Sequence, residues 1–166
     1  MESKAKLLGH AVHQMLIVFP VGLLATAVVF DVIHLSSNRP ELAAVAWWMI
    51  VAGLVGGAVA APFGLIDWLA IPSGTRAKTI GAMHGGGNVV MLGLFLASAL
   101  LRGGPDTPPP VLALVLSFAG AALATVTAWL GGELVTRLGI GVYGDADVNA
   151  PSSLHDDGKA PLARPR

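Results

Sequence analysis

The sequence predicts an all-α integral membrane protein, a four-helix bundle with both chain termini on the same side of the bilayer. Charged residues make up 12% of the 166 residues, against roughly 25% in soluble domains. The mean hydropathy is +0.72, and four apolar runs each approach the roughly 20 residues that a membrane-spanning helix needs. Since 10 basic and 10 acidic residues leave no net charge, these observations exclude a soluble enzyme, a disordered chain and a basic nucleic-acid-binding protein.

The chain contains no cysteine. Disulfides, thiolate nucleophiles, cysteine-ligated iron–sulfur clusters and covalent attachment of c-type haem are therefore excluded within it. Any metal or haem would have to be held by other side chains.

We expect helices at residues 11–35, 42–68, 79–101 and 110–134, inside a transmembrane domain that covers residues 1–142. The first helix follows a short basic segment, as a signal peptide would. Its apolar run continues past the small residues that end at Ala27, and we therefore expect it to be retained. The second helix is opened by Pro40, a favourable residue there, and contains Pro62, which removes a backbone donor and predicts a kink.

The third and fourth helices are joined by a connection rich in glycine and proline, from Gly103 to Pro110. Beyond the fourth helix the composition changes. Residues 143–166 are rich in Pro, Asp and Ser, which predicts a polar, disordered C-terminal tail.

The basic residues near the helix ends predict the orientation. The side shared by the two termini carries Lys4, Lys6, Arg76, Lys78 and Arg137, and the other side carries Arg39 and Arg102. Basic loops face the cytoplasm. We therefore expect a multi-pass protein of the bacterial inner (cytoplasmic) membrane with both termini in the cytoplasm.

Small residues recur one helical turn apart in three of the predicted helices. Gly53 and Gly57 form one pair, Gly81 and Gly85 another, and small residues recur every fourth position over residues 120–132. Small residues on one face let helix backbones approach closely in lipid. The pattern favours packing within this chain, and it leaves a homo-oligomer or a partner subunit as the alternative.

Few polar side chains fall inside the predicted spans, and most of them converge. Threading the helices up and down the bilayer places one set at the same depth, on the predicted cytoplasmic side: His10, His13, Asp67, His84, Asn88 and Glu133. An ionisable side chain in hydrocarbon is costly and marks a candidate functional site, so these are the candidate cofactor-binding residues. Asp31 shares a helix face with His13, because whole helical turns separate the two positions. We expect Asp31 to form an interfacial pair with His34.

Imidazole is a good ligand for haem iron, copper or zinc. His13 and His84 come from different helices, which can hold one ligand between them, and they are the candidate metal ligands. Asp67 or Glu133 would orient an imidazole by accepting its second N–H. The glycines after His84 predict room for a flat macrocycle or a quinone ring, and the methionines beside these histidines keep copper(I) as a further candidate.

The alternative interpretation needs no cofactor. The histidines would face lipid headgroups or pair with nearby carboxylates. Glu133 would form an ion pair with Arg137, one turn later. The glycines would then serve helix packing alone.

The motifs along the chain resemble those of a large family of small bacterial membrane proteins catalogued only as a domain of unknown function. The chain has G-H-A-V-H-Q-M at residues 9–15, where the family has G-H-P-x-H-P-M, and G-L-I-D-W at residues 64–68. The last predicted helix ends in G-G-E-L-V-T-R at residues 131–137. Ala11 and Gln14 replace the usual prolines, which predicts a less rigid entry into the first helix. The resemblance covers Leu8 to Val142 and implies a link to membrane electron transfer, because some relatives are joined to Rieske-type or c-type cytochrome domains.

These observations favour a cofactor-binding subunit linked to membrane electron transfer, with b-type haem as the first candidate and copper or a quinone after it. A structural or accessory subunit of a larger membrane complex, with no cofactor of its own, is the alternative. A transporter is less favoured, because the middle of the membrane offers almost no polar groups. No nucleophile–base pair indicates an enzyme. The expected partners are the lipid bilayer and redox or membrane-complex proteins, not nucleic acid.

Overall fold

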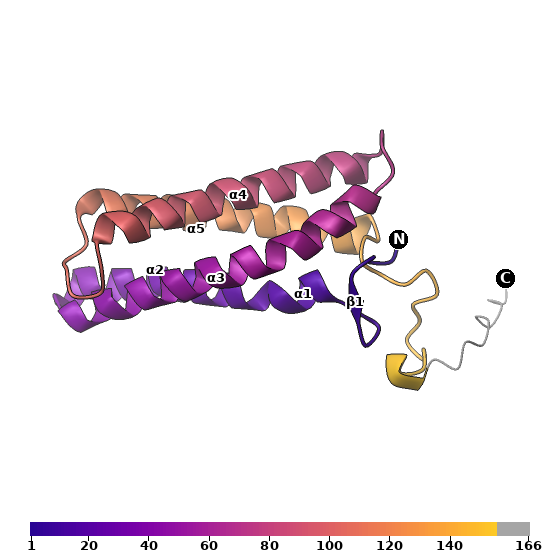
Figure 1. Ribbon diagram of the computed structural model, residues 1–166, viewed down its shortest axis with the longest axis horizontal. Coiled ribbons are helices and arrows are strands. Elements are labelled where there is room, and N and C mark those ends of the chain that lie inside the picture. The colour runs from indigo at the N-terminus through magenta and orange to yellow at the C-terminus, as the bar shows by residue number, and fades with distance from the viewer. Residues whose placement is uncertain (156–166) are drawn as a thin grey trace.

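The computed structural model describes residues 1–155 and consists almost entirely of helices (Figure 1). The long helices are α2 (Val18–Ser37), α3 (Pro40–Ala70), α4 (Arg76–Arg102) and α5 (Val111–Gly132). The short α1 (Val12–Leu16) leads directly into α2, because Ile17 and Val21 each donate a helical hydrogen bond to the residue four positions earlier. A five-residue π-helix, η1 (Glu133–Arg137), continues α5.

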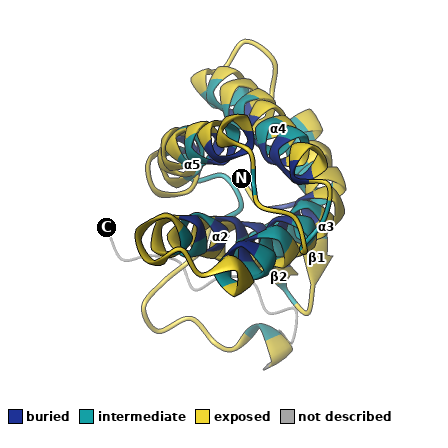
Figure 2. Ribbon diagram, turned by 90° about the vertical axis from the view of Figure 1, so that its left-hand side faces the viewer, coloured by how far each residue is buried: buried dark blue, intermediate teal, exposed yellow. Residues whose placement is uncertain are grey.

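In the described part of the chain, four helical segments are long and apolar enough to cross a membrane: Val12–Ser37, Pro40–Ala70, Arg76–Arg102 and Val111–Arg137. They lie side by side, and the buried residues face the middle of the bundle (Figure 2). α2 packs on α3, α3 on α4, α4 on α5 and α5 on α2, so α2 and α4 are diagonally opposite. The predicted fold class, an all-α four-helix membrane bundle, is confirmed.

The helix ends follow local chemistry. α3 begins at Pro40, whose fixed φ and missing N–H suit a first helical position. α4 begins after Thr75, whose side chain accepts a backbone hydrogen bond from the first turn. Asn38 and Gly103 end α2 and α4 in the left-handed conformation, with φ of 55° and 69°.

The interior sets small residues on one helix against larger ones on the next. Gly53 of α3 lies against Leu24 of α2, and Gly120 of α5 lies against Phe95 of α4. A Cβ on Gly53 would come within 2.7 Å of the leucine, and one on Gly120 within 2.8 Å of the phenylalanine. These glycines therefore serve packing inside the chain, whereas Gly85 faces open space.

The first eleven residues cross one end of the bundle. They include an antiparallel pair, β1 (Lys6–Leu7) and β2 (His10–Ala11), joined by a two-residue turn with positive φ at Leu8 and Gly9. After the bundle, residues 143–155 contain one short 3₁₀ helix, η2 (Ser153–His155). The remainder of the predicted tail, residues 156–166, lies outside the described residues.

Candidate functional site

Most of the candidate residues lie at the end of the bundle where α1 and α4 begin and where α3 and α5 finish. We call it the histidine end, and it carries His13, Asp67, His84, Asn88 and Glu133. The opposite end, where α2 and α4 finish, holds Asp31, Ser98, Arg102 and Ser117, and we call it the charged end.

His13 reaches from α1 to the backbone of α3. Its Nδ1 lies 3.0 Å from the carbonyl oxygen of Ala60. Gly64, one turn beyond Ala60, lies beneath the ring, and a Cβ there would come within 2.7 Å of His13 Cε1. The missing side chain of Gly64 therefore lets the imidazole lie flat against α3.

His84 makes the same arrangement between α4 and α5. Its Nδ1 lies 2.8 Å from the carbonyl oxygen of Thr127, and a Cβ on Gly131, one turn further, would lie 3.0 Å from His84 Cε1. Asn88 adds a contact, with its Nδ2 3.1 Å from His84 Nε2. The ring is thus held at both nitrogens.

These partners fix the proton on each imidazole. A carbonyl oxygen only accepts hydrogen bonds, so Nδ1 of each neutral ring carries the hydrogen. Nε2 then presents a lone pair, and on His84 it accepts from the Asn88 amide. Because a metal-binding histidine commonly donates its other N–H to a carbonyl or carboxylate, both rings are arranged as such ligands are.

The two histidines face the same interior. His13 and Asp31 are separated by about five complete helical turns, as are His84 and Arg102, so each pair shares one face of its helix. Asp31 and Arg102 meet across the bundle. Since His13 and His84 share their helix faces, each histidine lies on the face that points toward the diagonally opposite helix.

The Asp67 carboxylate holds the N-terminal segment and not an imidazole. Ser3 Oγ lies 2.7 and 2.8 Å from its two oxygens, and the Lys4 backbone N–H donates to it at 2.7 Å. Ser3 is buried by this arrangement. The N-terminal segment is therefore fastened across the histidine end.

Glu133 pairs with Arg76, at 2.6 Å between Oε1 and a guanidinium nitrogen. This pair ties the start of α4 to the end of α5. The alternative expectation of a Glu133–Arg137 pair is wrong, because Arg76 reaches the carboxylate across the helix pair. Neither Glu133 nor Asp67 forms a hydrogen bond with His13 or His84, and backbone carbonyls take the orienting position instead.

His10 lies apart from the other two histidines. It is exposed on β2, where its Nε2 is 3.4 Å from Ser153 Oγ. It borders a shallow cleft of about 340 Å³ between the start of α1 and the segment after η1, lined also by Gln14, Met15 and Tyr143. The structure thus separates His10 from the interior pair of histidines.

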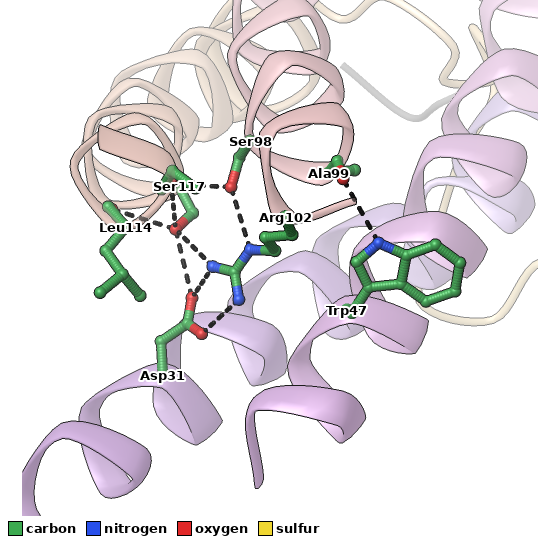
Figure 3. A network of polar contacts seen from close by, with 8 residues as sticks. Asp31, Trp47, Ser98, Ala99, Arg102, Leu114 and Ser117 are labelled. Carbon is green, nitrogen blue, oxygen red and sulfur yellow. Dashed lines mark hydrogen bonds and ion pairs between the residues drawn. The ribbon is translucent and has the colours of Figure 1, made fainter. Parts of the chain in front are cut away.

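At the charged end, the expectation of an interfacial Asp31–His34 pair is wrong. Asp31 instead accepts two hydrogen bonds from Arg102, at 2.8 and 2.6 Å, and both side chains are almost fully buried (Figure 3). Ser117 and Ser98 complete the network around the guanidinium. His34 turns to the loop, with its Nδ1 2.8 Å from the Arg39 carbonyl oxygen.

Arg102, Ser98 and Ser117 are the residues that the sequence analysis missed. The predicted helix ended at residue 101, and Arg102 was counted among the basic residues near the helix ends, although it belongs to the last turn of α4 and is buried. One signal was present: Arg102 follows His84 at the same separation along the chain at which Asp31 follows His13.

The glycines that follow His84 do not provide the expected room for a ligand inside the bundle. A Cβ on Gly85 or Gly86 would meet nothing within 4 Å, and both residues are exposed on the outside of α4, while Gly87 lies against Thr127. Among residues 1–155, no group of three or more histidine or carboxylate side chains is arranged to hold a metal ion. A ligand at this end would therefore rely on two imidazoles.

Fold and site together define a class: a small multi-pass membrane protein with four spanning helices and two carbonyl-held histidines at one end. A family model described as predicted membrane protein (DUF2231) matches residues 9–144. The chain belongs to this family, which confirms the resemblance to a membrane family of unknown function. No curated protein and no solved structure matches the chain significantly.

Proposed function

We propose that this protein is a cofactor-binding subunit linked to membrane electron transfer, and that b-type haem is its cofactor, with His13 and His84 as the ligands. One observation carries the proposal: both imidazoles donate Nδ1–H to a backbone carbonyl and so keep an Nε2 lone pair for a metal. Haem needs only two such side chains, which agrees with the lack of a larger ligand group in residues 1–155. When bound, haem would supply one-electron chemistry.

The chain's other residues take supporting roles in this proposal. The carbonyls of Ala60 and Thr127 orient the rings. The Asn88 amide, which occupies the Nε2 lone pair of His84, would turn away when a ligand binds. Asp67 and Glu133 hold the polypeptide around the site. We further propose that the histidine end faces the cytoplasm of a bacterial cell, as the basic residues predict.

The absorption spectrum of the full-length protein, purified in mild detergent from haem-replete cells, tests this proposal. We expect a Soret band that is strongly reduced in His13→Ala and in His84→Ala. His34→Ala is the matched control, because His34 also bonds a backbone carbonyl through Nδ1 but lies at the other end of α2. A colourless preparation would overturn the haem proposal, and metal analysis of the same sample would then test copper.

An accessory subunit without a cofactor is the second candidate. Gly86 and Gly93 on the outer face of α4 have open space in front of them, and such faces admit a neighbouring helix closely. This candidate predicts co-purification with a larger membrane protein, lost in Gly86→Leu and Gly93→Leu. A protein that stays single in mild detergent and in native membranes would contradict it.

A further inference from the structure

The buried positions of the first helical pair recur in the second. Adding 71 to the number of each buried residue of α2 gives a buried residue of α4. The residues of α2 are Pro20, Leu24, Ala27 and Asp31, and those of α4 are Met91, Phe95, Ser98 and Arg102. The two diagonal helices therefore bury the same face in the same register.

The other two helices repeat with a shift of 67. The buried residues Ala46, Ile50, Gly53 and Ala60 of α3 correspond to Ala113, Ser117, Gly120 and Thr127 of α5, which are also buried. The contacts repeat as well, because Gly53 meets Leu24 as Gly120 meets Phe95. Each half of the chain is thus one helical hairpin with the same internal packing.

The histidine arrangement belongs to this repeat. His13, the Ala60 carbonyl and Gly64 in the first half correspond to His84, the Thr127 carbonyl and Gly131 in the second, under the same two shifts. Each glycine follows its carbonyl by one turn and lies against its own imidazole.

The charged end locates the symmetry axis. Asp31 and Arg102 are corresponding residues, and they bond to each other. Corresponding residues of two related units touch only near the twofold axis that relates them. Since α2 and α4 both run from the histidine end to the charged end, an axis that relates the two halves would lie along the bundle, with His13 and His84 on either side of it.

We propose that the bundle is two copies of one helical hairpin about this axis, and that Gly64 and Gly131 are its equivalent positioning residues. Each glycine holds its imidazole in the Nδ1–H form, so that the two Nε2 lone pairs serve one ligand from equivalent sides. The ligand class is then a metal-centred group with two equivalent faces, a part of the inference that rests on the proposed function. The positioning of the two imidazoles by these glycines is inferred from the geometry of the protein alone.

The two halves differ at one contact. Subtracting 71 from Asn88 gives Ile17, which has no side-chain amide to bond the His13 ring. Only His84 therefore has its Nε2 lone pair engaged by a side chain of its own helix. Asn88→Ile makes the halves alike and is expected to leave the Nδ1–H form of His84 in place, because the Thr127 carbonyl sets it.

Nitrogen-15 NMR of the full-length protein with labelled histidine tests the positioning directly. Under alkaline conditions that keep the rings neutral, we expect protonated Nδ1 and unprotonated Nε2 on both His13 and His84, assigned through His→Gln variants. Gly64→Ala should remove the Nδ1–H form from His13 and leave His84 unchanged. Gly131→Ala should do the reverse, with a smaller loss, because the added carbon would lie 3.0 Å and not 2.7 Å from the ring.

Gly22→Ala and Gly132→Ala are the matched controls, because a Cβ at either position meets nothing within 4 Å. Both should keep the two Nδ1–H forms. A wild-type protein in which either histidine carries its proton on Nε2 would overturn the positioning even if the alanine variants do not fold. So would glycine variants that fold and leave the tautomers unchanged.

The outcomes separate this inference from the haem proposal. Two Nδ1–H imidazoles in a protein that never binds haem would keep the positioning and reject the cofactor. A haem protein whose apo form shows Nε2–H histidines would keep the cofactor and reject the positioning by Gly64 and Gly131.

Discussion

The charged end and the histidine end of the bundle hold their polar side chains in different ways. At the charged end, Asp31 and Arg102 are at most 2% exposed, and Arg102 donates two hydrogen bonds to the Asp31 carboxylate. At the histidine end, His13 and His84 are half-buried, and His13 Nε2 bonds to no described residue. The comparison assigns the charged end a structural role, whereas His13 Nε2 at the histidine end is the lone pair that the proposed function gives to a ligand.

The largest effect is expected when the charged pair is broken. Arg102→Leu leaves the Asp31 carboxylate buried without its partner, which destabilises a protein by about 3–5 kcal/mol. Unfolding in detergent, followed by circular dichroism, measures the loss. The double variant Asp31→Leu, Arg102→Met should recover most of it, since apolar replacements of a buried pair are often neutral. A single variant as stable as the wild type would contradict the role given to this end.

A smaller and local effect is expected at Asp67. Asp67→Ala removes the acceptor for Ser3 Oγ and the Lys4 N–H, and a hydrogen bond to a charged group contributes about 1.5–3 kcal/mol. The first eleven residues should then exchange amide hydrogens faster, while the helices keep their protection. Unchanged exchange over these residues would show that Asp67 does not fasten the segment.

His13→Ala and His84→Ala should each destabilise the cofactor-free protein by only about 0.5–1.5 kcal/mol, the net contribution of one ordinary hydrogen bond. The loss should be somewhat larger for His84→Ala, because His84 also accepts a hydrogen bond from the Asn88 amide. The same detergent unfolding measures them. A loss as large as that of Arg102→Leu would remove the distinction between the two ends.

The smallest effect is expected at the Arg76–Glu133 pair. Arg76 is 58% exposed and Glu133 17% exposed, and an exposed ion pair contributes about 0–1 kcal/mol. Arg76→Ala should therefore change the unfolding midpoint slightly at low salt and not at high salt, because salt screens exposed charges. A large loss of stability that persists at high salt would show that this pair contributes as much as the buried Asp31–Arg102 pair.

The fold was predictable because hydropathy and helix length determine membrane-spanning segments. Threading the helices up and down also brings His13, His84, Asp67 and Glu133 to one end of the bundle, where the structure has them. The partners of these residues did not follow. A backbone carbonyl such as that of Thr127 has no sequence signature, and Asp67 meets Ser3 only because the N-terminal segment folds back across the bundle.

Arg102 shows a second reason for a missed contact. When each helix end is interpreted by itself, an arginine there is assigned to the membrane–water interface, because a charge in lipid is costly. Here Asp31 on the diagonal helix neutralises it. The shift of 71 that relates His13 to His84 also relates Asp31 to Arg102, so an internal comparison of the two halves would have paired them.

The ratio of bound haem to protein, measured on full-length wild type, His84→Ala and His34→Ala from haem-replete cells, tests the central claim most directly. The account predicts haem in the wild type and in His34→Ala at equal ratios, and a severalfold loss in His84→Ala while its helices remain folded. Equal ratios in all three proteins, or no haem in any of them, would contradict the claim that the histidine end is the binding end.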